Sequence, residues 1–141
     1  MLALQLKIIM LNKILGSNFS KLVKSDCTWS FVFDGCVVST DDSWRLFKFE
    51  EMVISASDEG QNFCLTSPYD IPSLVSECLL GKPIDSYSFR YKFADLAIMI
   101  GGDFALEFVQ TSLGYESWSV LIDNTNYICL GGGRDIACIS R

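Results

Sequence analysis

The chain contains three pairs of adjacent acidic residues whose carboxylates could in principle catalyse a reaction. The pairs are Asp41-Asp42, Glu50-Glu51 and Asp58-Glu59, and with Arg45 and Lys48 between them residues 41–60 carry a net charge of −4. Two carboxylates held about 5 to 9 Å apart can hydrolyse a glycosidic bond. Adjacent carboxylates in loops more commonly serve solubility. A patch that faces a basic partner is the next interpretation, and catalysis is the least common of the three.

Histidine is absent from the 141 residues. The chain therefore lacks Ser-His-Asp and Cys-His catalytic arrangements, the usual general base near neutral pH, and the commonest ligand of transition metals. We predict no catalytic, cofactor or metal site, and we expect a protein that is not an enzyme.

The cysteines show no Cys-x-x-Cys spacing of the kind that grips zinc. Most fall in apolar runs and are interpreted as small buried residues of a reducing cytosol, with a disulfide framework as the alternative. A nucleophilic thiol is considered for three of them, but none has a base that the sequence identifies. The six are Cys27, Cys36, Cys64, Cys78, Cys129 and Cys138, and the three considered as nucleophiles are Cys36, Cys64 and Cys129.

The triplet Gly131-Gly132-Gly133 could suggest a phosphate loop. Such a loop needs a helix directly after it. Residues 136–139 alternate like a strand instead, so the triplet predicts a flexible turn or a bulge.

The charge is unevenly distributed, with a formal net charge of −6. Residues 1–24 contain four lysines and no acid, so the remainder carries −10. An acidic body argues against tracking nucleic-acid phosphates and permits a basic protein partner.

The first fifteen residues are strongly apolar, but they are too short to span a bilayer and have no signal-peptide pattern. They predict an amphipathic helix over 3–15, with Leu4, Ile8, Leu11 and Leu15 on one face. A start-site extension, with the domain beginning near Leu11, is the alternative. The expected location is cytoplasmic, with no membrane partner.

Residues 27–40 give the clearest β-hairpin in the sequence. Cys27, Trp29, Phe31 and Phe33 alternate, and Asp34-Gly35 suits a type I′ turn with positive φ at both residues. A two-residue turn fixes the register: Trp29 should face Thr40, Phe31 should face Val38, and this side should be core.

A helix is predicted over residues 71–80, because both of its ends carry suitable residues. Asp70 can cap the N-terminus, Pro72 fits the first turn, and Gly81 can end the helix. Its apolar stripe contains Leu74, Val75, Cys78 and Leu79.

Elsewhere the apolar residues alternate in short runs. Strands are expected over 18–24, 44–48 (extended or helical), 52–56, 61–65 and from 84 to 139, with Tyr87, Phe89 and Tyr91 on one face. The chain is therefore predicted to be one α+β domain over 1–141, with a β-rich body over 18–139. About eight to ten strands should form a meandering antiparallel sheet, curled or barrel-like, backed by the 71–80 helix. Residues 1–16 supply the possible N-terminal helix.

An ordered set of motifs resembles a family of small bacterial proteins associated with immunity to polymorphic and contact-dependent growth-inhibition toxins. The motifs are Trp29-x-Phe31-x-Phe33, Ser43-Trp44-Arg45, Asp58-x-Gly60-Gln61-x-Phe63, Gly114-Tyr115-Glu116-Ser117-Trp118 and Gly131-Gly132-Gly133. The chain departs from the pattern at Glu59, where the family has histidine, and in its tight Asp34-Gly35 turn.

The resemblance implies an immunity protein that binds and neutralises a cognate toxin domain, a basic domain such as a nuclease. Such a protein needs a rigid scaffold and a complementary surface rather than an active site. The expected partner-binding residues are Asp41, Asp42, Glu50, Glu51, Asp58 and Glu59, with Tyr69 and Tyr115 as aromatic anchors. Trp29, Trp44 and Trp118 are assigned to the core. The alternatives are a small carboxylate-using enzyme or ligand-binding barrel, and a module that self-associates through a strand edge.

Overall fold

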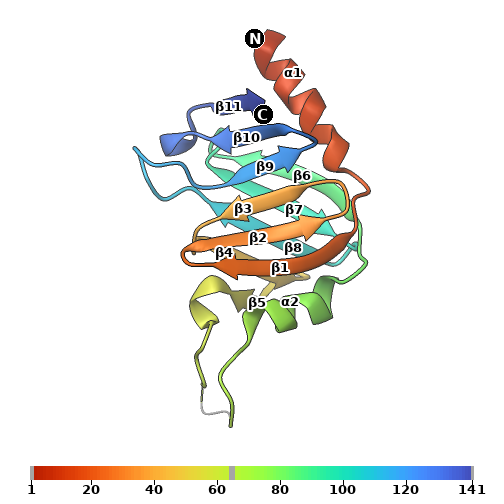
Figure 1. The fold of residues 1–141 in the computed structure, drawn as a ribbon, viewed down its shortest axis with the longest axis vertical. Coiled ribbons are helices and arrows are strands. Elements are labelled where there is room, and N and C mark those ends of the chain that lie inside the picture. The colour runs from red at the N-terminus through yellow and green to blue at the C-terminus, as the bar shows by residue number, and fades with distance from the viewer. Residues whose placement is uncertain (1, 64–65, 141) are drawn as a thin grey trace.

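The computed structural model describes residues 2–63 and 66–140, and confirms the α+β class (Figure 1). Its helices are α1 (Leu2–Leu11) and α2 (Ile71–Leu79), with short 3-10 turns η1 (Asn12–Ile14), η2 (Ala56–Asp58) and η3 (Gly131–Gly133). Its eleven strands are β1 (Phe19–Ser25), β2 (Thr28–Phe33), β3 (Val37–Thr40), β4 (Trp44–Lys48), β5 (Glu51–Ser55), β6 (Ile84–Arg90), β7 (Asp95–Ile100), β8 (Phe104–Val109), β9 (Ser119–Ile122), β10 (Thr125–Cys129) and β11 (Ile136–Ser140). Residues 64–65, at the end of the short strand expected over 61–65, lie outside the described residues, and residues 61–63 are not in a strand.

The strands form two antiparallel sheets instead of the single curled sheet expected. One sheet has the order β1-β2-β3-β9-β10-β11 and the other β5-β4-β8-β7-β6, and in the described residues neither closes into a barrel. The reason is that the chain changes sheet twice, between β3 and β4 and again between β8 and β9. Alternation reveals which side of a strand is buried but not which sheet the strand joins.

The core lies between the two sheets and is dominated by aromatic residues. The Phe31 ring of the six-stranded sheet makes edge contacts with the rings of Trp44 and Phe108 in the other sheet, at 4.9 and 5.4 Å between centroids. Trp29, Trp44 and Trp118 are buried as predicted.

The β2–β3 hairpin has the predicted register. Trp29 pairs with Thr40 and Phe31 with Val38, and both aromatic side chains are buried. The predicted turn type is wrong, because neither Asp34 nor Gly35 has a positive φ. A Cβ at Gly35 would meet the hydroxyl of buried Ser17, so the glycine leaves room for that side chain.

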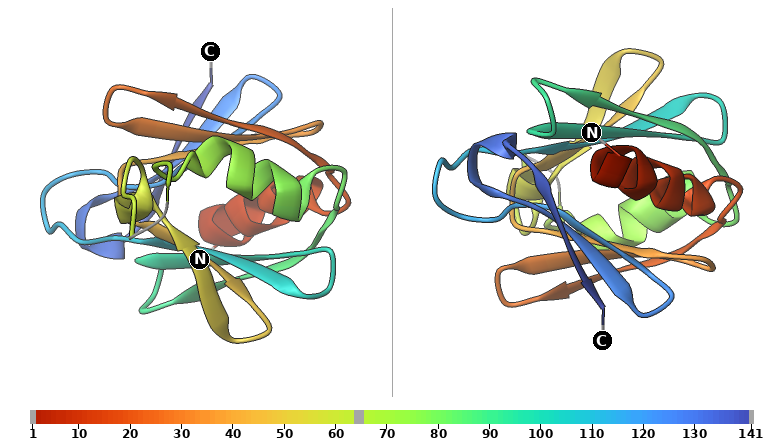
Figure 2. Two further views of the ribbon diagram at one scale, coloured as in Figure 1. Left: turned by 90° about the horizontal axis from the view of Figure 1, so that it is seen from below. Right: turned by 90° about the horizontal axis from the view of Figure 1, so that it is seen from above.

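Helix α2 begins at Ile71 as predicted and ends at Leu79, one residue before the predicted limit. The Asp70 carboxylate accepts hydrogen bonds from the amide and the hydroxyl of Ser73, and Gly81 follows the helix with φ +75°. Ile71, Val75 and Leu79 are buried, while Leu74 and Cys78 are partly buried against the core. The helix packs against β1 and β5, which are edge strands of different sheets, and so covers the gap between them (Figures 1 and 2).

The predicted N-terminal helix is present as α1, and it lies at the opposite side of the sandwich from α2 (Figure 1). The Tyr87 hydroxyl on β6 donates to the backbone oxygen of Ile8 and the side-chain oxygen of Asn12, at 3.1 and 2.6 Å. Leu11 is buried as expected, but Leu15 is exposed and Ile14 is buried in its place. The cause is η1, whose tighter turn rotates the last residues relative to an α-helix. The side chain of Leu4 lies outside the described part.

Candidate partner-binding surface

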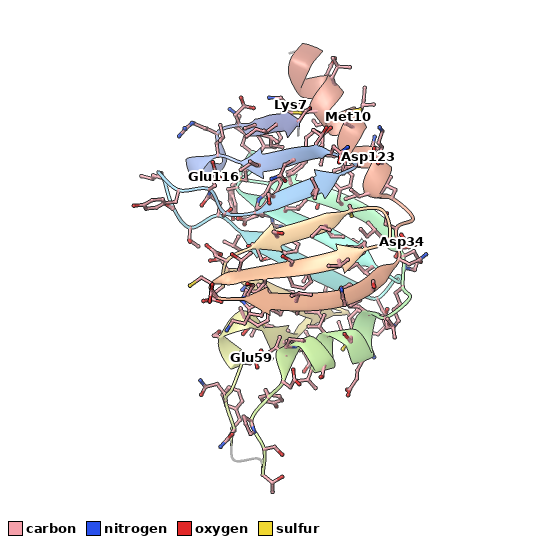
Figure 3. The ribbon with its side chains drawn as sticks, in the orientation of Figure 1. Lys7, Met10, Asp34, Glu59, Glu116 and Asp123 are labelled. Carbon is pink, nitrogen blue, oxygen red and sulfur yellow. The ribbon has the colours of Figure 1, made fainter. Side chains whose placement is uncertain are left out.

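Several connections leave the sandwich at the end where β4 begins, which we call the loop end. The connection 41–43 leads into β4, and the Val109 amide at the end of β8 donates to the Ser43 carbonyl at 2.9 Å. Arg45 pairs with Ser55, so β5 and η2 also finish here. Loop 110–117, which follows β8, therefore begins beside the 41–43 connection. In Figure 3 the labelled residues Glu59 and Glu116 lie along this side of the molecule.

Six of the eight predicted partner-binding residues lie on connections at the loop end. They are Asp41, Asp42, Asp58, Glu59, Tyr69 and Tyr115. Glu50 and Glu51 lie at the opposite end, in the turn that joins β4 to β5. There the Phe49 amide donates to the Asp103 carbonyl at 2.9 Å. The three acidic pairs therefore do not form one patch, because a five-residue strand separates the middle pair from the other two.

The side chains of the first acidic pair, Asp41-Asp42, form hydrogen bonds that fix the conformation of the 41–43 connection. The Asp42 carboxylate accepts a 2.7 Å hydrogen bond from the indole Nε1 of buried Trp29, and Asp41 accepts one from the Ser43 amide at 2.8 Å. Asp42 remains exposed, whereas Asp41 is half-buried. The pair thus presents negative charge while it fixes the passage of the chain between the sheets.

Replacing Asp42 with alanine is expected to lower the free energy of unfolding by about 1–3 kcal/mol, because the indole N–H of Trp29 loses its charged acceptor. Urea unfolding followed by tryptophan fluorescence measures this change. Glu116→Ala, an exposed acid at the same end, is the matched control and should change stability by less than about 0.5 kcal/mol. Equal effects of the two substitutions would contradict the structural role of Asp42.

The third acidic pair, Asp58-Glu59, and Tyr69 lie at the two ends of one loop. The Asp58 carboxylate accepts a hydrogen bond from the Ser55 amide at 3.0 Å, which completes a capping box around η2. The backbone groups of Tyr69 bond those of Gly60 and Gln61, at 3.0 and 2.8 Å. Tyr69 is half-buried, and its ring lies 5.4 Å from that of exposed Phe63.

Loop 110–117 presents two highly exposed apolar side chains, Leu113 at 87% and Tyr115 at 80%. Its backbone is nevertheless braced. The Gln110 amide nitrogen Nε2 donates to the carbonyls of Tyr115 and Leu130, at 3.0 and 3.2 Å, and the Gly132 amide donates to the Ser112 carbonyl at 2.7 Å. The loop therefore holds Tyr115 outward from a fixed base.

Leu113 is not among the predicted partner-binding residues, and the alternation predicts Tyr91 on the same face as Tyr87 and Phe89. Tyr91 is 73% exposed, because it adopts a left-handed conformation with φ +56° and turns away from the strand. Residues 91–94 contain none of the glycine, proline, asparagine or aspartate residues that usually mark a turn, so the sequence does not reveal this conformation. Both side chains add apolar surface to the loop end.

The glycine triplet is a close-packed contact instead of a flexible turn. A Cβ at Gly131 would collide with the Leu113 carbonyl, and one at Gly133 would collide with the backbone of Ala94. The Phe93 amide donates to the Gly133 carbonyl at 3.1 Å, and the Trp118 indole donates to the Ala94 carbonyl at 3.2 Å. The triplet thus joins the β6–β7 turn to the six-stranded sheet. The strand predicted after it is present as β11.

Two of the cysteines considered as nucleophiles are buried in the core. Burial raises the pKa of the Cys36 thiol to about 12 and also raises the pKa of Cys129. Both thiols are thus protonated and inaccessible at neutral pH. Cys64 lies outside the described residues.

A concavity of about 480 Å³ lies on the outer face of the five-stranded sheet. Arg45, Arg90, Asp95 and Glu107 line it, and none of the six predicted acids does. Arg45 donates from Nε and Nη2 to one oxygen of Glu107, at 3.0 and 2.6 Å. Partial burial, together with the nearby Glu107 carboxylate, raises the pKa of Asp95. The two positive and two negative side chains give the concavity no net charge.

Among the residues that the structure describes, no helix combines the length and the apolar character needed to cross a membrane. Comparisons of the chain with family models, with curated proteins and with solved structures found no match.

Proposed function

We propose that this chain is an immunity protein, which neutralises a cognate bacterial toxin domain by binding it through the loop end. The observation that carries the proposal is the combination of exposed acids and exposed apolar side chains on one braced end of the sandwich. Asp42 lies there beside the start of loop 110–117, which carries Leu113 and Tyr115. Buried aromatic anchors supply most of the energy of protein interfaces, and charges around them steer the partner.

The hydrogen bonds of the described loop-end residues support this proposal. Hydrogen bonds brace loop 110–117, the Trp29 indole holds the Asp42 carboxylate, and a capping box holds Asp58. A surface already ordered before association loses little conformational entropy on binding, so more of the contact energy appears as affinity. The toxin domain we infer is basic, which matches the −6 net charge of the chain.

The direct test uses the protein encoded by the gene that precedes the gene for this chain. Its C-terminal domain is expressed in a sensitive bacterium, with and without this chain, and growth is followed. We expect growth arrest without the chain, restored growth with it, and a complex with a dissociation constant in the nanomolar range. Failure of both protection and complex formation would overturn the proposal for this partner.

Neutralising acids at the loop end, and separately at the opposite end of β4, tests whether the loop end attracts the partner more strongly than the rest of the acidic surface does. The double variant Asp58→Asn/Glu59→Gln is expected to slow association about 3- to 10-fold at low salt, because it removes two charges that attract the partner. Its matched control, Glu50→Gln/Glu51→Gln, removes the same charge from the opposite end and should leave the rate within about twofold. Stopped-flow or surface-plasmon-resonance kinetics at two ionic strengths measure both. Equal slowing by the two variants would assign the effect to net charge alone and contradict the role of the loop end.

A further inference from the structure

The outer face of the six-stranded sheet is almost free of charge, and this distinguishes it from the other outer face. Cross-strand pairing and burial together identify the outward side chains of β2, β3, β9, β10 and β11. All are uncharged: Thr28, Ser30, Val32, Val37, Ser39, Ser119, Leu121, Asn126, Ile128, Ala137 and Ile139. On the edge strand β1, Lys21 pairs with Val32 and brings the first charge.

The outer face of the five-stranded sheet shows what an ordinary solvated face of this protein carries. Arg45 pairs there with Glu107, and Arg90 with Asp95. A sheet face exposed to water normally alternates apolar and polar or charged side chains along each strand. In a chain with 20% charged residues, five neighbouring strands without one outward charge are therefore unexpected for a face that stays solvated.

The arrangement of charges matches the anatomy of a protein interface, which has a charge-depleted centre and a polar rim. Figure 3 views the sandwich from the side of this sheet, and its labelled residues Lys7, Asp34, Glu59, Glu116 and Asp123 all lie around the margin. The centre is formed by the cross-strand pair Ser39 and Ser119, which joins β3 to β9 in the middle of the strand order. At the margin, Ile139 is 54% exposed.

We propose that this neutral sheet face binds a second copy of the same chain in a two-fold symmetric dimer. A two-fold axis places a patch against itself, so a charged patch would meet like charges, whereas a neutral patch is self-complementary. Each copy carries a net charge of −6, and this face keeps the acids of both copies out of the contact. Glu59 and Glu116 of the loop end lie at the rim of this contact, and its centre contains none of the predicted partner-binding residues.

The size of the face sets the strength of the dimer. The five neutral strands, about 4.8 Å apart and about five residues long, give a flat footprint of about 400 Å² per copy. A standard stable interface buries about 800 Å² per partner, so this dimer belongs to the weak class. We expect dissociation in the micromolar range, within reach of sedimentation measurements.

The test is sedimentation velocity of the whole chain from about 1 to 500 µM, with variants at the central serine. Wild-type protein should show a monomer–dimer equilibrium. Ser119→Asp and Ser119→Lys should each weaken it at least about tenfold, because each places two like charges near the axis. An equimolar mixture of the two variants should associate again, and this rescue also shows that both variants fold. Ser88→Asp, on the outer face of the other sheet, is the control and should dimerise like wild type.

A wild-type chain that stays monomeric over the whole range would overturn the proposal and leave the face to a different protein. A dimer that Ser119→Asp does not weaken would overturn it as well, since the contact would then lie on another surface. Absence of rescue in the mixture would contradict the two-fold arrangement.

Discussion

Replacing Gly133 with alanine is expected to lower the free energy of unfolding by about 2–5 kcal/mol, as the sum of backbone strain and steric overlap. Gly133 has φ +70°, and its missing Cβ leaves the space that the Ala94 backbone occupies. The overlap is hard to relieve because the colliding atoms belong to the backbone of a turn, and this turn is hydrogen-bonded to Gly133, Trp118 and Gln110. Urea denaturation followed by circular dichroism measures the loss.

Gly60→Ala is the matched control for this effect. Gly60 has φ +75°, close to the +70° of Gly133, but beyond its chain neighbours no atom of the described residues lies within 4 Å of the position of its Cβ. It therefore carries the strain without the overlap, and we expect a loss of about 1–2 kcal/mol. If both variants lost the same stability, the close contact between Gly133 and Ala94 would have no energetic importance.

Phe31→Ala is expected to lower the free energy of unfolding by about 3–5 kcal/mol, the range for removing a buried aromatic ring from a packed core. Phe31 is completely buried, and its ring contacts the rings of Trp44 and Phe108. Its removal leaves a cavity between the two sheets, and the surrounding rings cannot move far enough to fill it. Thermal unfolding followed by near-ultraviolet circular dichroism reports both the stability and the packing of the neighbouring tryptophans.

Phe47→Ala is the corresponding control. Phe47 belongs to β4 but is half-buried on the outer face of its sheet, so its removal opens no enclosed cavity. We expect a loss of about 1 kcal/mol. A loss at Phe31 no larger than that at Phe47 would contradict the assignment of the Phe31 cluster as the centre of the core.

Local patterns were sufficient for the hairpin and for helix α2. The register of Trp29 with Thr40 follows from alternation and loop length, and the limits of α2 follow from Asp70 and Gly81. Each of these features depends on residues close together in sequence. The predicted conformation of the turn at Gly35 is wrong, and the residue that packs against this glycine, Ser17, lies far away along the chain.

The division into two sheets could not be predicted, because it depends on a long-range pairing. Val37 pairs with Leu121 and Ser39 with Ser119, and no local signal connects segments so far apart. The same limit applied to the candidate surface. The sequence identified three acidic pairs, but the direction of β4 determines that Glu50 and Glu51 lie at the end away from Asp41 and Asp58.

The pairing of β3 with β9 also has a consequence for how the chain is made. During synthesis strands β1 to β3 emerge before β9, and β3 keeps one open edge until residues 119–122 have left the ribosome. The whole five-stranded sheet lies between them in the sequence. Loops this long must close before the contact gains energy, which slows folding of β-rich proteins to milliseconds or seconds. Until then the unpaired edge of β3 can join another nascent chain, so rapid overproduction favours aggregation through this strand.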